Sequence, residues 1–269
     1  RVGGGGRRQQ EMPSQWEVSV LMVILMAVLV VLYVVHSVWA TSEAYSSPSI
    51  VLSAKSADGS SIVFDDYREA YAWLRHNTPQ DAKVMSWWDY GYQVSAIANR
   101  TTIVDNNTWN NTHIATVALA FASAENQAIK VLEMLSVDYV MVVFGGMTGM
   151  ASDDMNKFLW MARVAQGVFD GKTSVAGMTP VVTAAEYGIG GITVGEDGSP
   201  QLHRSLLYKL SYYRFGGMQT EYGKPAGYDR VRQEEVGVKD IELKHLEEVY
   251  TTQHWLVRIY KVNKDNQFR

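Results

Sequence analysis

The chain of 269 residues contains no cysteine, which excludes disulfide bonds and cysteine-ligated metal sites. It has 24 Lys and Arg against 28 Asp and Glu, which gives a net charge of −4. The sequence therefore lacks the excess of positive charge that is typical of nucleic-acid-binding proteins. With 47% hydrophobic and 19% charged residues it has the composition of a folded protein rather than a disordered one. The lack of cysteine does not exclude an oxidising compartment, because a domain of this size can bury enough core without disulfides.

Charge is also absent from one long apolar stretch, Val18–Val35, which Trp16 and Trp39 bracket. As a helix, the segment from Trp16 to Trp39 would span roughly 34 Å, enough to cross a bilayer, and tryptophan suits both membrane interfaces. The stretch is too long for a signal peptide, and a buried core helix is not normally apolar on every face. Because arginines precede it and Glu43 follows it, we predict a transmembrane helix with a cytosolic N-terminus.

The predicted organisation has four parts: a disordered cytosolic segment (1–15), the transmembrane helix (16–40), a linker rich in Ser and Ala (41–62), and a globular domain (63–269). A membrane span in this position places the globular domain on the lumenal or extracellular side. The chain begins with Arg rather than Met, which we interpret as a sign that it is a piece of a longer protein.

Strand and helix patterns alternate in the globular part. A helix capped by Asp65 or Asp66 is expected to end at Asn77-Thr78-Pro79. The remaining patterns predict strands over 83–87, 101–105, 137–144 and 255–262, a hairpin around 196–198, and helices over 112–122, after a Ser123 cap, and over 153–168, 204–214 and 240–250. The order strand, helix, helix, strand predicts a mixed α/β domain built in layers.

Two adjacent tryptophans and an aspartate, Trp87, Trp88 and Asp89, form the most distinctive stretch of the chain. Gly91 permits a tight turn on which the three side chains converge. Two indole N–H donors and one carboxylate acceptor would then saturate a single Ser or Thr hydroxyl. Such a pocket rejects a side chain without the hydroxyl, because its own polar groups would stay unpaired. The alternative is a piece of aromatic core, since large aromatic residues usually serve packing.

The run Trp-Trp-Asp-Tyr-Gly at residues 87–91 resembles the signature of the catalytic subunit of oligosaccharyltransferase, the enzyme that moves a lipid-linked glycan onto asparagine. The resemblance continues through Tyr92-Gln93 and through residues 100–113, 137–146 and 153–163. It looks most like the eukaryotic branch and covers nearly everything from about Val18 to Val262.

This resemblance implies that the chain is the last membrane span and the lumenal C-terminal portion of that subunit. Trp87, Trp88 and Asp89 would then bind the +2 hydroxyl of an Asn-x-Ser/Thr acceptor polypeptide, and Tyr90 would be a further substrate-binding residue. It also implies a dolichol-linked oligosaccharide donor, a location in the endoplasmic reticulum membrane, and Mn²⁺ or Mg²⁺ held by acidic loops of an N-terminal multi-span region. Those loops are missing here, so we expect acceptor recognition with no catalytic residue and no metal ligand in this chain. Whether the enzyme works alone or with other oligosaccharyltransferase subunits stays open.

A second motif is Asp154, Lys157 and Met161, which share one face of the predicted helix. Taken alone, the spacing describes an exposed ion pair beside a core methionine. It also resembles the family's second lumenal motif, which implies that the helix lines the same pocket and that Met161 contacts the methyl group of a threonine, worth about 1 kcal/mol. Lys157 would either order the Trp-Trp-Asp turn or contact the hydroxyl. Gly91 and Asp154 are expected to position the residues that contact the substrate without contacting it themselves.

Three glycosylation sequons, beginning at Asn99, Asn106 and Asn110, lie close together downstream of the predicted span. Asn110 is the favoured acceptor because it precedes a predicted helix, whereas Asn99 abuts a strand. Asn106 is too near Asn110 for both to be occupied. The alternative is a polar, asparagine-rich turn.

A function from another class also fits the sequence: a single-span membrane protein whose lumenal domain binds peptides and has no catalytic activity. The coding sequence upstream of Arg1 discriminates between the two, because further apolar spans with acidic loops would favour the transferase. Asp153-Asp154 lacks a further ligand at metal-binding spacing and is interpreted as a helix start.

Overall fold

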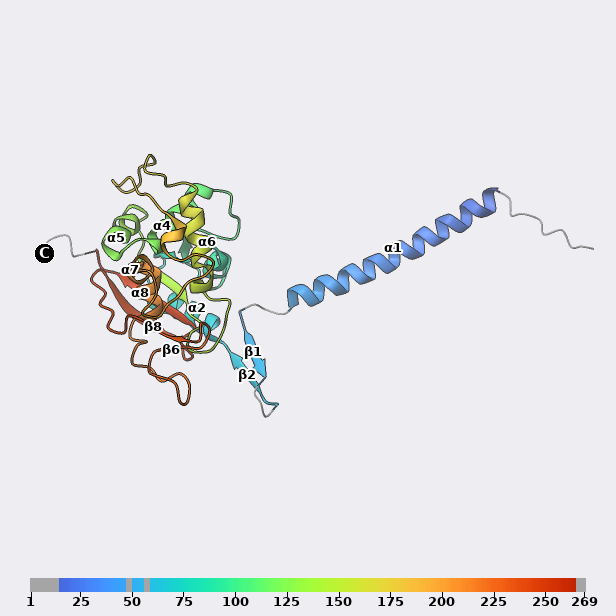
Figure 1. Ribbon diagram of the computed structural model, residues 1–269. Helices are drawn as coiled ribbons and strands as arrows, with labels where there is room; N and C mark the ends of the chain where they lie inside the picture. The colour runs from blue at the N-terminus through green and yellow to red at the C-terminus, as the bar shows by residue number, and fades with distance from the viewer. Residues whose placement is uncertain (1–14, 47–49, 56–58, 265–269) are drawn as a thin grey trace, which may run out of the picture. The chain divides into compact units, whose positions relative to one another are not determined.

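The computed structural model describes residues 15–46, 50–55 and 59–264, so the predicted disordered segment lies almost wholly outside it. The chain divides into two compact units, residues 1–49 and 50–269. The first contains helix α1, Gln15–Ser46 (Figure 1). Its part from Gln15 to Thr41, with a mean hydropathy of 3.2, is by length and composition apolar enough to cross a membrane. The helix continues past the predicted boundary at residue 40.

A β-hairpin opens the second unit. Strands β1 (Leu52–Lys55) and β2 (Ser61–Phe64) pair antiparallel, with Leu52 opposite Phe64. Part of the segment that we expected to be a linker is therefore a hairpin.

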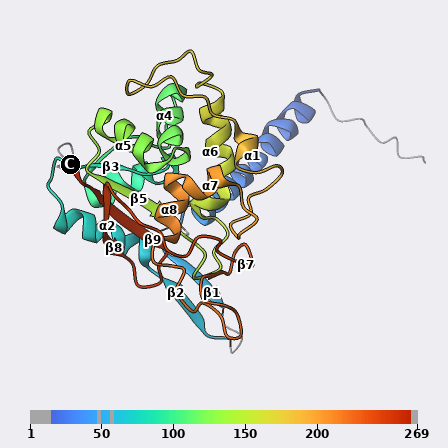
Figure 2. The same ribbon diagram turned by 60° about the vertical axis from the view of Figure 1, so that its left-hand side comes forward.

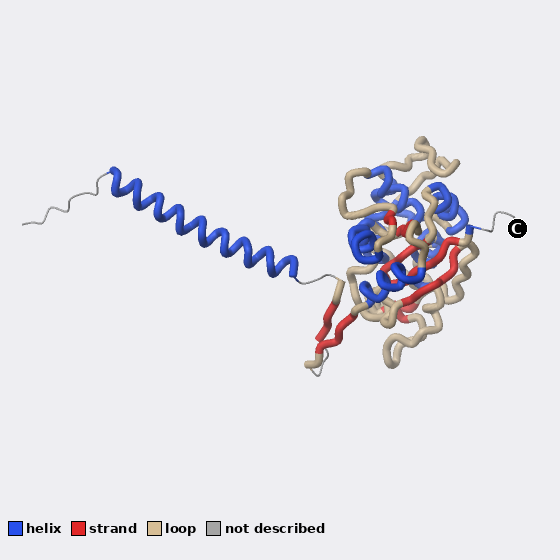
Figure 3. The backbone as a smooth tube through the Cα atoms, turned by 180° about the vertical axis from the view of Figure 1, so that it is seen from behind, coloured by secondary structure: helices blue, strands red, loops and turns tan. Residues whose placement is uncertain are grey.

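A five-stranded mixed sheet forms the centre of the domain (Figure 3). The strands lie in the order β4-β3-β5-β9-β8. Its strands are β3 (Lys83–Met85), β4 (Thr101–Thr102), β5 (Tyr139–Val143), β8 (Leu246–Thr251) and β9 (Val257–Val262). Strands β4, β3 and β5 run parallel to one another, whereas β9 is antiparallel to both β5 and β8. All of β5 is buried, as its continuous apolar run predicts. The mixed α/β class is confirmed.

Helices and short turns surround this sheet. They are α2 (Asp66–Asn77), η1 (Trp88–Tyr90), α3 (Gly91–Gln93), η2 (Val94–Ala98), α4 (Asn111–Ala122), α5 (Glu125–Met134), α6 (Asp154–Gln166), η3 (Ala184–Glu186), α7 (Pro200–Arg204) and α8 (Leu206–Tyr212), and a small ladder joins β6 (Tyr228–Asp229) to β7 (Glu234–Glu235).

Opposite faces of the sheet are covered by α2 and α8 (Figure 2). Trp73 of α2 packs edge-on against Tyr139 and stacks on Tyr250. On the other face, Arg258 of β9 is fully buried and donates hydrogen bonds to the carbonyl oxygens of Leu210 and Ser211 in α8. Side chains of a strand point alternately to the two faces, so β9 contributes to both layers of the core.

Some local predictions were wrong. Residues 240–250 are not helical, and their C-terminal part forms strand β8. This edge strand forms because it pairs with β9, and its own Glu-rich sequence does not indicate that partner. Ser123 is the C-cap of α4, and Ala124 rather than Ser123 is the N-cap of α5. The residues around 196–198 form a turn that no strands flank within the described part of the chain.

Candidate functional site

Three loops meet at one edge of the sheet because β4, β3 and β5 are parallel neighbours. The carboxyl ends of parallel strands lie on the same side, where α/β folds usually place their sites. Trp87–Asp89 follows β3, Asn106 follows β4, and Asp154 and Lys157 begin the helix that follows β5. Residues up to 68 positions apart in the chain are thereby brought together.

The turn after β3 is held close to the loop after β4. Gly91 has an ordinary helical φ of −59°, so it is not needed for a left-handed conformation. A Cβ at this position would lie 2.4 Å from both the Cα of Asp105 and the carbonyl oxygen of Val104. Glycine is therefore required by close backbone approach, not by the turn geometry that the sequence suggested. The rings of Trp87 and Trp88 lie 6.2 Å apart and are tilted by 50°.

Lys157 joins the turn to α6. Its Nζ lies 3.2 Å from Oδ2 of Asp89 and donates over 3.0 Å to the hydroxyl of Tyr90. The Tyr90 hydroxyl donates in turn to Oδ1 of Asp154, over 3.1 Å. The other oxygen of Asp154 accepts from the backbone N–H of Val143, over 2.8 Å. This chain of hydrogen bonds connects the end of β5, the start of α6 and the turn.

Several polar groups of the turn have no partner within the described residues. They are the indole N–H groups of Trp87 and Trp88 and the Oδ1 atom of Asp89. Asp89 and Lys157 keep 31% and 26% of their side-chain surface exposed, so a ligand can reach them. The unpartnered groups amount to two donors and one acceptor, which is the set that one aliphatic hydroxyl can satisfy.

Burial is the largest cause of the pKa shifts of Asp154 and Tyr90, which lie next to the turn. It raises the pKa of Asp154 to about 7, although Lys157 and the N–H of Val143 oppose this shift. Burial also raises the pKa of Tyr90 well above its usual value, and the neighbouring Asp154 adds to the increase. Tyr90 therefore stays a neutral hydroxyl that donates to Asp154 and accepts from Lys157.

The stability of the folded protein is expected to depend on pH through Asp154. Its folded-state pKa lies above the unfolded value of about 4, so between these two values the folded state binds more protons than the unfolded state. This contribution is fully present below about pH 4 and is lost as the pH rises through 7. Urea unfolding between pH 4 and 8 should give a flatter profile for Asp154→Asn, whereas the exposed Glu133→Gln should retain the wild-type slope.

The other residues singled out in the sequence take different places. Met161 is fully buried in the core, so its contact with a threonine methyl stays a prediction. Asn99, Asn106 and Asn110 are all exposed. Asn110 caps α4, with its Oδ1 accepting from the N–H of His113 over 3.0 Å. Which sequon is used likewise stays a prediction.

One supporting cluster was missed from the sequence. Arg232 is almost fully buried and bonds to the carboxylates of Asp153 and Asp229. Asp153 also caps α6, because its side chain accepts a hydrogen bond from the N–H of Asn156. It accepts a second hydrogen bond from the N–H of Gly145. The start of the Lys157 helix is thus anchored by an arginine 79 positions further along the chain. No local pattern indicates this partner.

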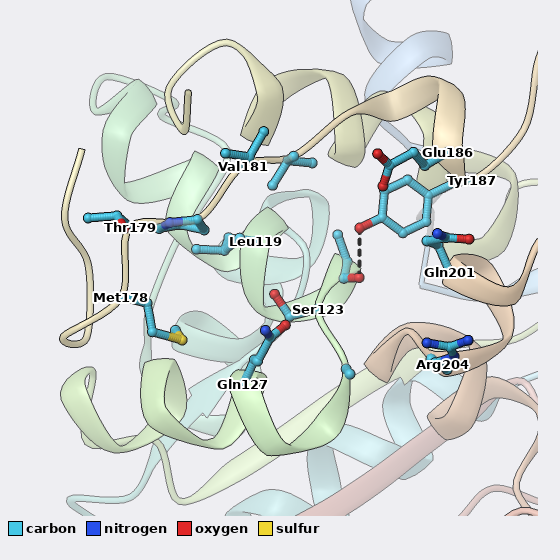
Figure 4. Close-up of a pocket in the computed structure, with 14 residues that line it drawn as sticks. Leu119, Ser123, Gln127, Met178, Thr179, Val181, Glu186, Tyr187, Gln201 and Arg204 are labelled. Atoms are coloured by element: carbon cyan, nitrogen blue, oxygen red, sulfur yellow. Dashed lines mark hydrogen bonds between the residues drawn. The ribbon is translucent and has the colours of Figure 1, made fainter. Parts of the chain in front are cut away.

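A separate cavity of about 430 Å³ lies where α4 meets α5, against the loop that leads to η3 (Figure 4). Ser123, Gln127, Glu186 and Arg204 line it, and the hydroxyl of Tyr187 donates to the Ala122 carbonyl over 3.0 Å. The cavity shares no residue with the Trp-Trp-Asp turn.

Comparison with known proteins finds a family match over the segment that contains this site. The STT3/PglB/AglB core domain matches residues 80–166, which run from just before β3 to the end of α6. The chain is 55% identical over 97% of its length to the dolichyl-diphosphooligosaccharide--protein glycosyltransferase subunit STT3B of Oryza sativa subsp. japonica. It is also 55% identical, over 90% of its length, to the corresponding STT3 subunit of Dictyostelium discoideum.

The chain spans about a third of the length of these relatives, 35% and 33% respectively. Among solved structures it is similar to the C-terminal globular domain of an oligosaccharyltransferase from Archaeoglobus fulgidus. That similarity has a TM-score of 0.43 and 20% identity, and covers 74% of this chain and 97% of the other.

Proposed function

Because this chain carries the STT3/PglB/AglB core domain, we propose that it is the acceptor-recognising part of an oligosaccharyltransferase catalytic subunit. Its turn binds the hydroxyl at the +2 position of Asn-x-Ser/Thr. The observation that carries the proposal is the free Oδ1 of Asp89, which follows Trp87 and Trp88 directly in the same turn while Lys157 holds Oδ2.

Each group has a defined role in this proposal. Asp89 accepts the proton of the acceptor hydroxyl, and Trp87 and Trp88 donate to its lone pairs. Lys157 donates one hydrogen bond to Asp89 and one to the hydroxyl of Tyr90, so the carboxylate of Asp89 is held in one orientation. A preorganised site loses less conformational entropy when the peptide binds. The ammonium group has a third proton, which can reach either Asp154 or the bound hydroxyl.

The chemistry of glycan transfer belongs, on this proposal, to parts of the enzyme outside the chain. The donor is a dolichol-linked oligosaccharide, and Mn²⁺ or Mg²⁺ polarises the reacting groups when bound. Within the described residues there is no cluster of three or more His, Asp or Glu side chains that could hold such an ion. In this proposal α1 spans the endoplasmic reticulum membrane and the globular domain lies in the lumen.

Peptide binding tests the proposal directly. We expect a labelled Asn-x-Thr peptide to bind the protein about tenfold or more tightly than the Asn-x-Val peptide. Valine has the shape of threonine but leaves Asp89 and the indoles unpaired, which costs about 1–3 kcal/mol. Fluorescence anisotropy titrations of the two peptides measure the difference. Equal dissociation constants would rule out recognition through the hydroxyl.

A further inference from the structure

We infer that the side-chain amide of Asn106 is a positioning group for the Trp-Trp-Asp turn. The inference rests on the proposed function of that turn. Nδ2 of Asn106 donates to the carbonyl oxygen of Asp89 over 3.1 Å, and its Oδ1 accepts from the N–H of Tyr92 over 3.3 Å. One amide thus holds the backbone on both sides of Tyr90 and Gly91.

Backbone packing reinforces these two hydrogen bonds. Gly91, between the two bonded positions, lies against Val104 and Asp105, with no space for a side chain. The loop after β4 therefore contacts the turn at three successive places. Because Asp89 is itself the residue whose backbone is held, a loss of the Asn106 amide lets the carboxylate move relative to Lys157.

The role requires an amide. A side chain must donate to one backbone group and accept from another at the same time, and the planar amide of asparagine has both a donor and an acceptor at its end. Aspartate has the same shape and keeps the acceptor for Tyr92 N–H, but it cannot donate to the carbonyl of Asp89. Its negative charge would repel that carbonyl oxygen. Asn106→Asp is therefore a nearly isosteric way to break half of the contact.

Asn106 also begins the sequon Asn106-Asn107-Thr108, so an attached glycan is a rival explanation for any effect of its mutation. The side-chain amide of Asn110, the first residue of the neighbouring sequon, makes fewer hydrogen bonds than that of Asn106. Only its Oδ1 is engaged, by the N–H of His113, and its amide nitrogen has no partner within the described residues. The two roles of Asn106 can be separated because the sequon also needs Thr108, which has no hydrogen bond to the turn within the described residues.

The test uses the full-length enzyme that contains this chain and measures transfer to an Asn-x-Thr peptide. Asn106→Asp should raise KM for the acceptor about fivefold or more, while KM for the lipid-linked donor stays at the wild-type value. Thr108→Asn removes the sequon, keeps the Asn106 amide and suits the left-handed φ of 51° at this position. It should leave both KM values unchanged.

The possible outcomes separate the explanations. If Thr108→Asn raises the acceptor KM as much as Asn106→Asp does, the effect belongs to the glycan and the inference is overturned. If Asn106→Asp lowers only the amount of active enzyme and leaves the acceptor KM unchanged, the amide is merely structural and the inference is again overturned. Asp89→Ala is measured in parallel. If Asp89→Ala leaves kcat/KM for the acceptor at the wild-type value, the proposed function itself fails. If Asp89→Ala lowers kcat/KM while Asn106→Asp leaves the acceptor KM unchanged, only the inference about Asn106 fails.

Discussion

Replacing Asp89 with alanine is expected to abolish glycosylation by the complete enzyme, with a fall of about 100-fold or more in kcat/KM for an Asn-x-Thr peptide. The variant removes the acceptor for the substrate hydroxyl proton and leaves Lys157 without its nearest carboxylate oxygen, 3.2 Å away. Truncating one partner of a buried hydrogen-bonded charge pair costs about 2–5 kcal/mol, and each 1.4 kcal/mol is about tenfold. Because Asp89 and Lys157 are partly exposed, the expected effect lies near the lower end of this range. Initial rates with the purified enzyme measure the effect.

Two variants accompany this measurement. Asp89→Asn keeps the shape and one acceptor oxygen but loses the charge, so its activity should fall between those of alanine and the wild type. Asp170→Ala removes an exposed carboxylate beyond the C-terminal end of α6 and should transfer at the wild-type rate. Near-normal transfer by Asp89→Ala at normal expression would contradict the role assigned to the turn.

The largest expected effect on stability follows from replacing Arg232 with methionine. Asp153 and Asp229 are completely buried, and both bond to the guanidinium of Arg232. Without it, two buried carboxylates lose their main counter-charge, and breaking a buried ion pair costs about 3–5 kcal/mol. The free energy of unfolding, measured by urea denaturation, should fall by this amount.

Lys172→Ala is the control for Arg232→Met. Lys172 pairs with Asp170 over 3.8 Å, and both side chains are mostly exposed, so the loss should stay below about 1 kcal/mol. If Arg232→Met changed the free energy of unfolding no more than this control, the buried cluster would not anchor the start of α6.

Local chemistry accounts for the predictions that succeeded. The apolar run of β5, the alternation in β9 and the stop at Asn77-Thr78-Pro79 are properties of neighbouring residues, and each element is found close to its predicted place. The prediction failed at β8 because an edge strand is stabilised by its partner. Its own residues, rich in Glu and Leu, suit a helix as well as a strand.

The sequence alone determined the apolar helix, the α/β class and the residue types that can satisfy one hydroxyl, because these depend on composition and short-range spacing. Only the tertiary structure decided that Lys157 meets Asp89, that Gly91 is required by a close approach to Asp105, and that Asn106 bonds to the turn. The order of the parallel strands β4, β3 and β5 brings their three following loops to one edge of the sheet. Strand order depends on contacts between distant parts of the chain, which no local pattern records.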